Sequence, residues 1–249
     1  MSISHTIKDG IADVLVDYPP VNALPVQGWF DLADTLRLVG RDPQVRVVIL
    51  RASGRGFNAG VDIKEMQATE GHQALLGANR GCFDAFAAVY DCEVPVIVAV
   101  HGFCLGGGVG LVGNADIIIM SDDATLGLPE VDRGALGAAT HLARLVPQHR
   151  MRAMVYTSER ISAQELHQFG SVYAVVPKEQ LETKAQEVAK KIASKLPTVI
   201  RAAKQSLNGI DPIDVKRSYR YEQGFTYELN LDGVADEARD DFVKSGAKD

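Results

Sequence analysis

Two glycine-bearing loops constrain most strongly what this 249-residue chain can fold into. The loops are residues 57–62 (FNAGVD) and residues 102–108 (GFCLGGG). Each loop follows an apolar run typical of a buried strand, residues 45–51 (VRVVILR) and 94–100 (VPVIVAV), and each leads into a helical segment. Repeated strand-loop-helix units predict an α/β fold in which helices cover stacked parallel strands.

The tips of these loops also suggest a catalytic role. A strand that turns into a helix through small residues presents free backbone N–H groups at its tip. Two such tips that face one point form an oxyanion hole, in which each donor contributes about 2.7–4 kcal/mol to a transition state with negative charge on a carbonyl oxygen. The sequence therefore predicts a catalytic site between the two loops.

The remaining pattern adds a hairpin and several helices. Apolar residues alternate over residues 3–17 around Asp9-Gly10, which predicts a β-hairpin. Apolar spacing predicts helices near residues 29–39 and 73–90, and residues 115–121 and 172–176 resemble buried strands. From about residue 137 the pattern is mostly helical, with a capping box that starts at Ser162.

Composition excludes several classes of protein. A net charge of -6 argues against a nucleic-acid partner, because such proteins usually carry a basic stripe. Apolar runs of about seven residues are too short to span a membrane, and the N-terminus lacks the layout of a signal peptide. Three cysteines and six scattered histidines lack the spacing of a disulfide framework or a metal site. We therefore expect a metal-free cytoplasmic protein with reduced, buried cysteines.

Three blocks in this order resemble the crotonase (enoyl-CoA hydratase/isomerase) superfamily: FNAGVDIKEM, PVIVAVHGFCLGGGVGL and ADIIIMSDDATLGLPEV. The resemblance implies a crotonase (ClpP-like) α/β fold built of repeated strand-strand-helix units. It implies a core of residues 1–195 with a coenzyme A thioester site, and a helical region of residues 196–249 for packing and oligomer contacts. A small-molecule acyl-CoA substrate, no tightly bound cofactor other than this coenzyme A, and a homotrimer or homohexamer are implied as well.

The same resemblance assigns roles to single residues. The backbone N–H groups of Ala59 and Gly107 would form the oxyanion hole, and Glu130 would be the general base or acid. Glu130 follows an apolar turn, and an exposed turn glutamate is the alternative interpretation. The implied substrate- and coenzyme-A-binding residues are Asn22, Ala23, Leu24, Gly60, Val61, Asp62, Ile63, Lys64, Gly110 and Arg133.

One departure from the family pattern limits the reactions that this chain is expected to catalyse. Hydratases of the family use a second glutamate, and its position is occupied here by Gly110. Concerted addition of water to a double bond is therefore disfavoured, whereas one carboxylate with an oxyanion hole suits hydrolysis of a carbon–carbon bond. We also expect Gly110 to leave volume for a bulky acyl group.

Three further segments resemble an actinobacterial, steroid-degrading branch of the family: YPPVNALP, RGCFDAF and YELNLDGVADEARDDF. That branch includes hydrolysis that opens the last ring of cholesterol as a bicyclic coenzyme A thioester. The leading prediction is therefore ring-opening hydrolysis. The alternatives are an enoyl-CoA isomerase or hydratase that uses Glu130 alone, and an inactive coenzyme-A-binding subunit.

Several residues keep two interpretations. Residues 108–113 match the dinucleotide motif G-x-G-x-x-G, but Gly108 lies eight residues after Val100, too far from the strand end for that site. Asp62 is suited to cap a helix. Lys64 and Arg55 are candidate phosphate contacts or ordinary surface charges. His141 is a candidate contact for a polar group of the substrate, and we expect His101 to be structural.

Overall fold

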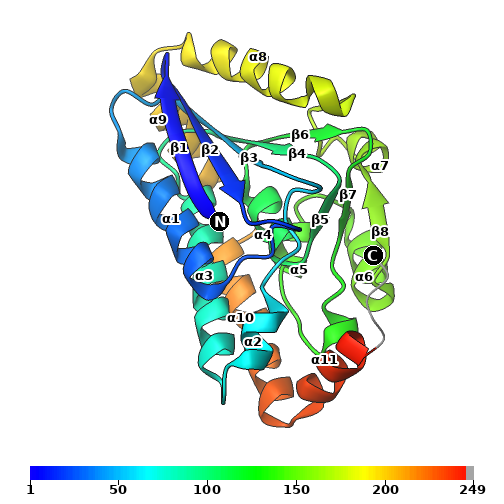
Figure 1. The fold of residues 1–249 in the computed structure, drawn as a ribbon. Coiled ribbons are helices and arrows are strands. Elements are labelled where there is room, and N and C mark those ends of the chain that lie inside the picture. The colour runs from blue at the N-terminus through cyan, green and yellow to red at the C-terminus, as the bar shows by residue number, and fades with distance from the viewer. Residues whose placement is uncertain (245–249) are drawn as a thin grey trace.

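The chain is built around a six-stranded sheet with the strand order β1-β2-β3-β4-β6-β9, seen in a computed structural model that describes residues 1–244 (Figure 1). The strands are β1 (Ser2–Lys8), β2 (Ile11–Asp17), β3 (Val47–Ala52), β4 (Val96–Val100), β6 (Ile117–Ser121) and β9 (Ala174–Val176). β1 and β2 form the predicted antiparallel hairpin, and every later pair in this sheet is parallel. The turn residues Asp9 and Gly10 both have positive φ angles, 52° and 78°, as a tight two-residue turn requires.

A second sheet, which the sequence pattern did not indicate, has the strand order β5-β7-β8. Its strands are β5 (Phe103–Leu105), β7 (Thr125–Gly127) and β8 (Arg160–Ser162). β5 lies within the second glycine loop, and β7 precedes Glu130 by three residues. This small sheet therefore joins the loop to the segment that carries the candidate base.

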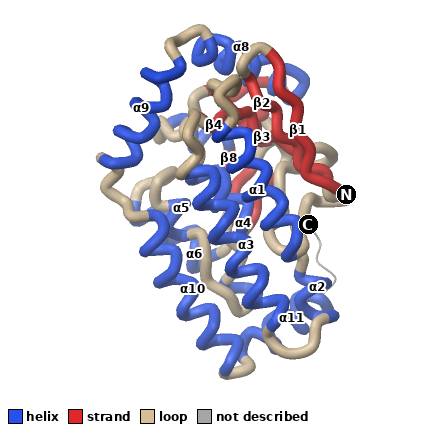
Figure 2. The backbone as a smooth tube through the Cα atoms, turned by 90° about the vertical axis from the view of Figure 1, so that its left-hand side faces the viewer, coloured by secondary structure: helices blue, strands red, loops and turns tan. Residues whose placement is uncertain are grey.

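Helices cover the larger sheet on both faces. They are α1 (Val26–Arg41), α2 (Ile63–Ala68), α3 (Gln73–Tyr90), α4 (Gly107–Asn114), α5 (Ala139–Leu142), α6 (Gln148–Thr157), α7 (Ala163–Gln168), α8 (Leu181–Ala193), α9 (Pro197–Gly209), α10 (Val215–Leu231) and α11 (Val234–Lys244), with short 3₁₀ turns at η1 (Val131–Arg133) and η2 (Lys178–Gln180). α8 crosses one face, while α1 and α3 lie side by side against the other (Figures 1 and 2).

The strand residues alternate between these two layers. Ile49 and Ile97 pack with Val188 of α8, whereas Leu50 and Val98 belong to the larger core that includes Trp29 of α1. A parallel strand covered on both faces needs apolar residues at consecutive positions, which explains the unbroken apolar runs of β3 and β4.

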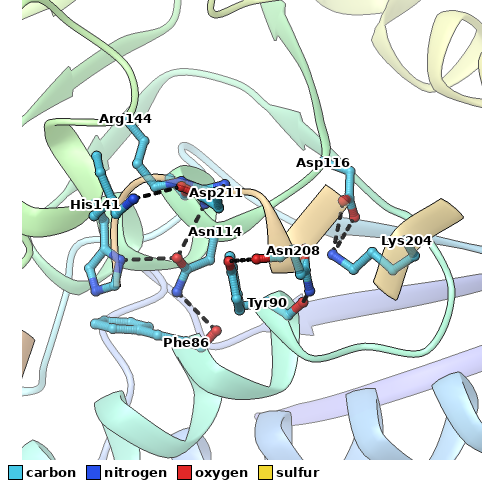
Figure 3. Close-up of polar contacts among 11 residues, drawn as sticks. Phe86, Tyr90, Asn114, Asp116, His141, Arg144, Lys204, Asn208 and Asp211 are labelled. Carbon is cyan, nitrogen blue, oxygen red and sulfur yellow. Dashed lines mark hydrogen bonds and ion pairs between the residues drawn. The ribbon is translucent and has the colours of Figure 1, made fainter. Parts of the chain in front are cut away.

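The C-terminal helices are fastened to this core by buried polar contacts (Figure 3). Lys204 of α9 is 4% exposed, and its Nζ lies 2.8 Å from Oδ2 of Asp116, just before β6. Asn208 donates to the carbonyl of Tyr90 at 2.7 Å, and the Tyr90 hydroxyl donates back to the carbonyl of Asn208 at 3.1 Å. The division at residues 195/196 stays a prediction, and the last five residues of that predicted region lie outside the described residues.

Candidate active site

The two glycine loops lie side by side. The N–H of Phe57 donates to the carbonyl of Phe103 at 2.8 Å, and the N–H of Leu105 donates to the carbonyl of Asn58 at 2.8 Å. Asn58 and Cys104 form an isolated parallel bridge. These bonds hold the end of the first loop against β5 of the second, and so they bring two segments 45 residues apart in sequence to one place.

Residues 22–24 lie beside the first loop, as their hydrogen bonds to Gly60 and Asp62 require. The N–H of Leu24 donates to the carbonyl of Gly60, and the N–H of Asp62 donates to the carbonyl of Leu24, both at 2.9 Å. The Asn22 side chain is 2% exposed and donates to the carbonyls of Ser53 and Gly56. Its amide therefore supports the loops from within, and none of the predicted residues Asn22, Ala23 and Leu24 lines the pocket beside the loops.

The predicted oxyanion donors face a common pocket. Ala59 and Gly107 both line it, and within residues 1–244 neither backbone N–H has a hydrogen-bond partner. Gly60 has a φ angle of +86°, and a Cβ at Gly60 would lie 3.4 Å from the nitrogen of Gly107. The first loop thus lies against the N-terminus of α4, where the backbone donors of a helix are free and its dipole favours negative charge.

Glu130 lies directly beside this helix N-terminus. A Cβ at Gly106 would lie 2.7 Å from Oε1 of Glu130, and Gly106 has a φ angle of +56°. Only glycine allows both this backbone conformation and so close an approach of the carboxylate. Oε2 of Glu130 is buried and has no hydrogen-bond partner among the described residues, so the alternative of an exposed turn glutamate is wrong.

Burial raises the pKa of Glu130 from its ordinary value of 4.5 to about 8. Its own backbone N–H and the charge of Arg133 lower this pKa, and the charge of Glu222 raises it further. A carboxyl group with a pKa near neutrality can both accept and return a proton, as general acid–base catalysis requires.

The pocket brings together predicted and unpredicted residues. Among those predicted, the lining includes Ala59, Gly60, Val61, Ile63, Gly107, Glu130 and Arg133. Sequence reasoning missed the lining residues Asn79 and Cys82 of α3, Tyr219, Thr226 and Asn230 of α10, and Arg239 of α11. The C-terminal region therefore forms part of the pocket wall, a role beyond the packing expected of it.

Other predicted residues lie outside the lining. The Asp62 carboxylate accepts from the backbone N–H of Lys64 at 2.9 Å and of Glu65 at 3.4 Å, which confirms the predicted N-cap of α2. The side chains of Lys64 and Arg55 are exposed, as either a phosphate contact or a surface charge would be. His101 lies 3.0 Å from the carbonyl of Gly54 through Nε2, a structural contact like the one expected.

Gly110 does not line the pocket, so the volume expected there for the substrate is absent. A Cβ at Gly110 would lie 2.3 Å from two ring carbons of Phe86, so the phenyl ring fills the space that glycine leaves. The ring is held edge-on against Trp29, with centroids 5.8 Å apart. A carboxylate at position 110 would have to displace Phe86. Among the described lining residues, Glu130 is the one acidic side chain.

His141 does not line this pocket. Figure 3 shows its ring beside Asn114 and Phe86. Its ring packs against Phe86 and Tyr219, with centroids 5.0 and 5.1 Å away, and its Nδ1 lies 3.1 Å from Oδ1 of Asn114. Burial, followed by the charge of Arg144, lowers the pKa of His141 to about 3, so the ring is neutral near neutral pH. The structure thus gives His141 a packing role in place of the predicted substrate contact.

Neither a metal centre nor a membrane span is found in the part of the chain that the structure describes. Residues 1–244 hold no group of three or more His, Cys, Asp or Glu side chains placed to bind a metal ion. None of their helices is long and apolar enough to cross a membrane. The three cysteines are buried free thiols.

The fold and the paired loops are those expected of the enoyl-CoA hydratase/isomerase family, and comparison with known proteins identifies the same family. Residues 6–231 match the enoyl-CoA hydratase/isomerase family model, and the chain belongs to that family. An enoyl-CoA hydratase/isomerase from Xanthobacter autotrophicus Py2 superposes with a TM-score of 0.87 at 25% identity, over 98% of this chain and 92% of that one.

Within the family, the chain is similar to two proteins with a more specific activity. Both are named (7aS)-7a-methyl-1,5-dioxo-2,3,5,6,7,7a-hexahydro-1H-indene-carboxyl-CoA hydrolase. The protein from Rhodococcus jostii (strain RHA1) is 68% identical over 98% of this chain and 94% of its own length. The protein from Mycobacterium tuberculosis (strain ATCC 25618 / H37Rv) is 64% identical over 97% and 98%.

Proposed function

We propose that this chain opens a ring of a bicyclic, steroid-derived acyl-CoA thioester by hydrolysis of a carbon–carbon bond. The observation that carries the proposal is the 68% identity, over nearly the whole chain, with a hydrolase of a hexahydroindene-carboxyl-CoA. The site agrees with it, because one buried carboxylate beside a pair of free backbone donors suits this reaction.

The reaction begins when Glu130 takes a proton from water and the oxygen of that water attacks a ring ketone. The ketone carbon becomes tetrahedral and its oxygen becomes negatively charged. When the carbon–carbon bond beside it breaks, the electron pair passes towards the thioester, and the N–H groups of Ala59 and Gly107 stabilise the resulting enolate. Glu130 returns the proton to carbon. One water is consumed, and the products are a carboxylic acid and a C–H bond in the same molecule.

The coenzyme A portion would follow the loop edges. The backbone of Leu24 pairs with Gly60 and Asp62 of the first loop, and the carbonyl of Asn22 accepts from Nδ2 of Asn58. We expect Asn22, Ala23 and Leu24 to contact the pantetheine and adenine groups through backbone atoms. Gly60, Val61 and Ile63 line the pocket itself, and the next residue, Lys64, is exposed and would contact phosphate. No tightly bound cofactor is needed, because every proton transfer uses Glu130.

The other candidate functions are weaker. Hydration of an enoyl-CoA uses two carboxylates, and Phe86 fills the space from which the second would project. An inactive coenzyme-A-binding subunit would have no need of a buried carboxylate with a pKa of about 8 beside the loops. Isomerisation by Glu130 alone remains the alternative reaction, and the assay described below distinguishes it from hydrolysis.

We propose that the protein acts in the cytoplasm as a homotrimer or homohexamer. Its buried free thiols suit a reducing compartment. An apolar groove lined by Met151, Val155 and Ile213 is bordered by Tyr156 and Tyr221, which are 71% and 72% exposed. A surface of this kind suits contact between subunits. Light scattering coupled to size-exclusion chromatography measures the oligomeric state, and a monomer at all concentrations would remove this part of the proposal.

The decisive experiment offers purified protein two substrates, crotonyl-CoA and a bicyclic keto-acyl-CoA. Mass spectrometry should detect the gain of one water on the bicyclic thioester, and fragmentation should place a free carboxyl group where the ring was closed. Hydration of crotonyl-CoA without ring opening would instead establish a hydratase. An unchanged mass with a shifted double bond would establish an isomerase.

A further inference from the structure

If the proposed ring hydrolysis is correct, negative charge develops on two different oxygen atoms during the reaction. The first is the ketone oxygen, when water adds to the ring. The second is the carbonyl oxygen that receives the electron pair after the carbon–carbon bond breaks. The N–H groups of Ala59 and Gly107 can donate hydrogen bonds to the carbonyl oxygen of the thioester. The ketone oxygen therefore needs donors of its own.

Arg133 is placed to supply a positive charge near the attacked carbon. It lies three residues after Glu130 at the end of η1, and its backbone N–H donates to the carbonyl of Glu130 at 2.9 Å. Its side chain lines the same pocket as Glu130 and Gly107, and its charge acts on the Glu130 carboxylate. The water that Glu130 activates must lie next to this carboxylate, so the attacked carbonyl comes within the field of Arg133.

Asn79 offers a neutral donor in the same pocket. Its Nδ2 is buried and has no hydrogen-bond partner among the described residues. A buried donor without a partner is uncommon in folded proteins and calls for an explanation. The backbone at this position is fixed, because the carbonyl of Asn79 accepts from Nε2 of Gln223 at 2.7 Å. A carbonyl oxygen of the substrate in the pocket would supply the missing acceptor.

We propose that Arg133 and Asn79 form a second oxyanion site, which binds the ring ketone oxygen that water attacks. In the first step a C–O bond forms, the ketone C=O π pair moves onto oxygen between these donors, and Glu130 holds the proton. In the second step the C=O bond forms again, the ring bond breaks, and the pair moves to the thioester end. The acid that is released then lies beside the Arg133 guanidinium as a carboxylate.

The test uses full-length protein and single-turnover ring opening of the bicyclic keto-acyl-CoA, with each rate taken at its pH-independent plateau. Arg133→Met should lower the plateau rate about 10²–10³-fold, the loss typical of one removed oxyanion donor. Arg133→Lys should recover part of this loss because the charge remains. Asn79→Leu, which keeps the branched shape of the side chain and removes the donor, should lower the rate at least about tenfold.

Three readouts separate this role from a structural one. The affinity for the thioester, measured in a Glu130→Gln background, should change less than threefold for Arg133→Met. The rising limb of the pH–rate profile should move to higher pH, because the cation that lowers the pKa of Glu130 has been removed. Arg150→Met, which breaks a partly buried ion pair with Glu165 away from the pocket, should leave the ring-opening rate within threefold of the parent.

The outcomes distinguish this proposal from the one on which it rests. Ring opening by the parent together with an Arg133→Met plateau rate within threefold of the parent would overturn the second oxyanion site alone. A fall in kcat/KM that is fully matched by a loss of affinity, with the rate constant at saturating substrate unchanged, would overturn it too, since the interaction would then be uniform binding. A parent protein that opens no ring would overturn both proposals.

Discussion

Glu130→Gln should lower turnover and raise stability at the same time, because burial of an ionised carboxylate opposes folding. Glu130 has a pKa of about 8 in the folded chain against an ordinary 4.5. Since each tenfold change in acidity corresponds to about 1.4 kcal/mol, this difference sets an upper bound of about 5 kcal/mol. Below pH 4.5 the group is protonated in both states and contributes no pH dependence.

Between pH 4.5 and pH 8 the unfolded chain is ionised while the folded chain still holds the proton. The folded state therefore binds more protons, and its stability falls as the pH rises through this window. Glutamine is neutral in both states. The stability of Glu130→Gln relative to the parent should be smallest near pH 4.5 and largest above pH 8, where we expect a gain of about 1–3 kcal/mol after local relaxation.

Thermal melts at pH 5 and pH 8.5 measure this difference, at about 2–4 °C per kcal/mol for a chain of this size. Glu179→Gln, at an exposed carboxylate, is the matched control and should change stability by less than about 0.5 kcal/mol at both pH values. Single-turnover ring opening should fall by about 10²–10⁴ in Glu130→Gln. A gain that is equal at both pH values would refute the buried-carboxylate reasoning, and a rate within threefold of the parent would place the base elsewhere, with Asp62 examined next.

Three further predictions concern the pocket and its walls. Crotonyl-CoA hydration should be slow or absent, and turnover near the enzyme median of about 10 per second would mean that Gly110 does not change the reaction. In a complex with a coenzyme A thioester, the carbonyl oxygen should lie within about 3.5 Å of the nitrogen of Ala59 or Gly107, and a longer distance to both would remove the oxyanion assignment. Gly110→Ala should destabilise the fold by about 1–3 kcal/mol in urea titrations, because the added methyl group meets the Phe86 ring; an unchanged midpoint would show that the ring moves at little cost.

Sequence patterns predicted the elements whose signal is local. The hairpin at Asp9-Gly10, the long amphipathic helix α3 and the Asp62 cap all appear where they were expected, because turn chemistry, apolar spacing and capping act over a few residues. The second sheet was missed because its strands have three residues each, too few to show alternation.

The unpredicted part of the pocket has a different explanation. Its wall on α10 is made by a buried face that is polar, with Tyr219, Gln223, Thr226 and Asn230 at spacings of four, three and four residues. Apolar periodicity cannot detect such a face. Polar residues in helical register that are each buried would have been the signal, and burial is not visible in one sequence.

This polar face explains how the C-terminal helices shape the site. Thr226 exchanges hydrogen bonds with the backbone of Leu136, and Asn230 accepts from Nη1 of Arg239 at 2.8 Å. α10 thereby holds both the segment that follows Arg133 and the middle of α11. The proposed oxyanion donors come from the two glycine loops, whereas much of the remaining pocket lining comes from α3, η1, α10 and α11. We therefore expect the choice of reaction to depend on this part of the pocket, where Asn79 and Arg133 are proposed to bind the ketone oxygen, and on Phe86, which fills the space that a carboxylate at position 110 would need.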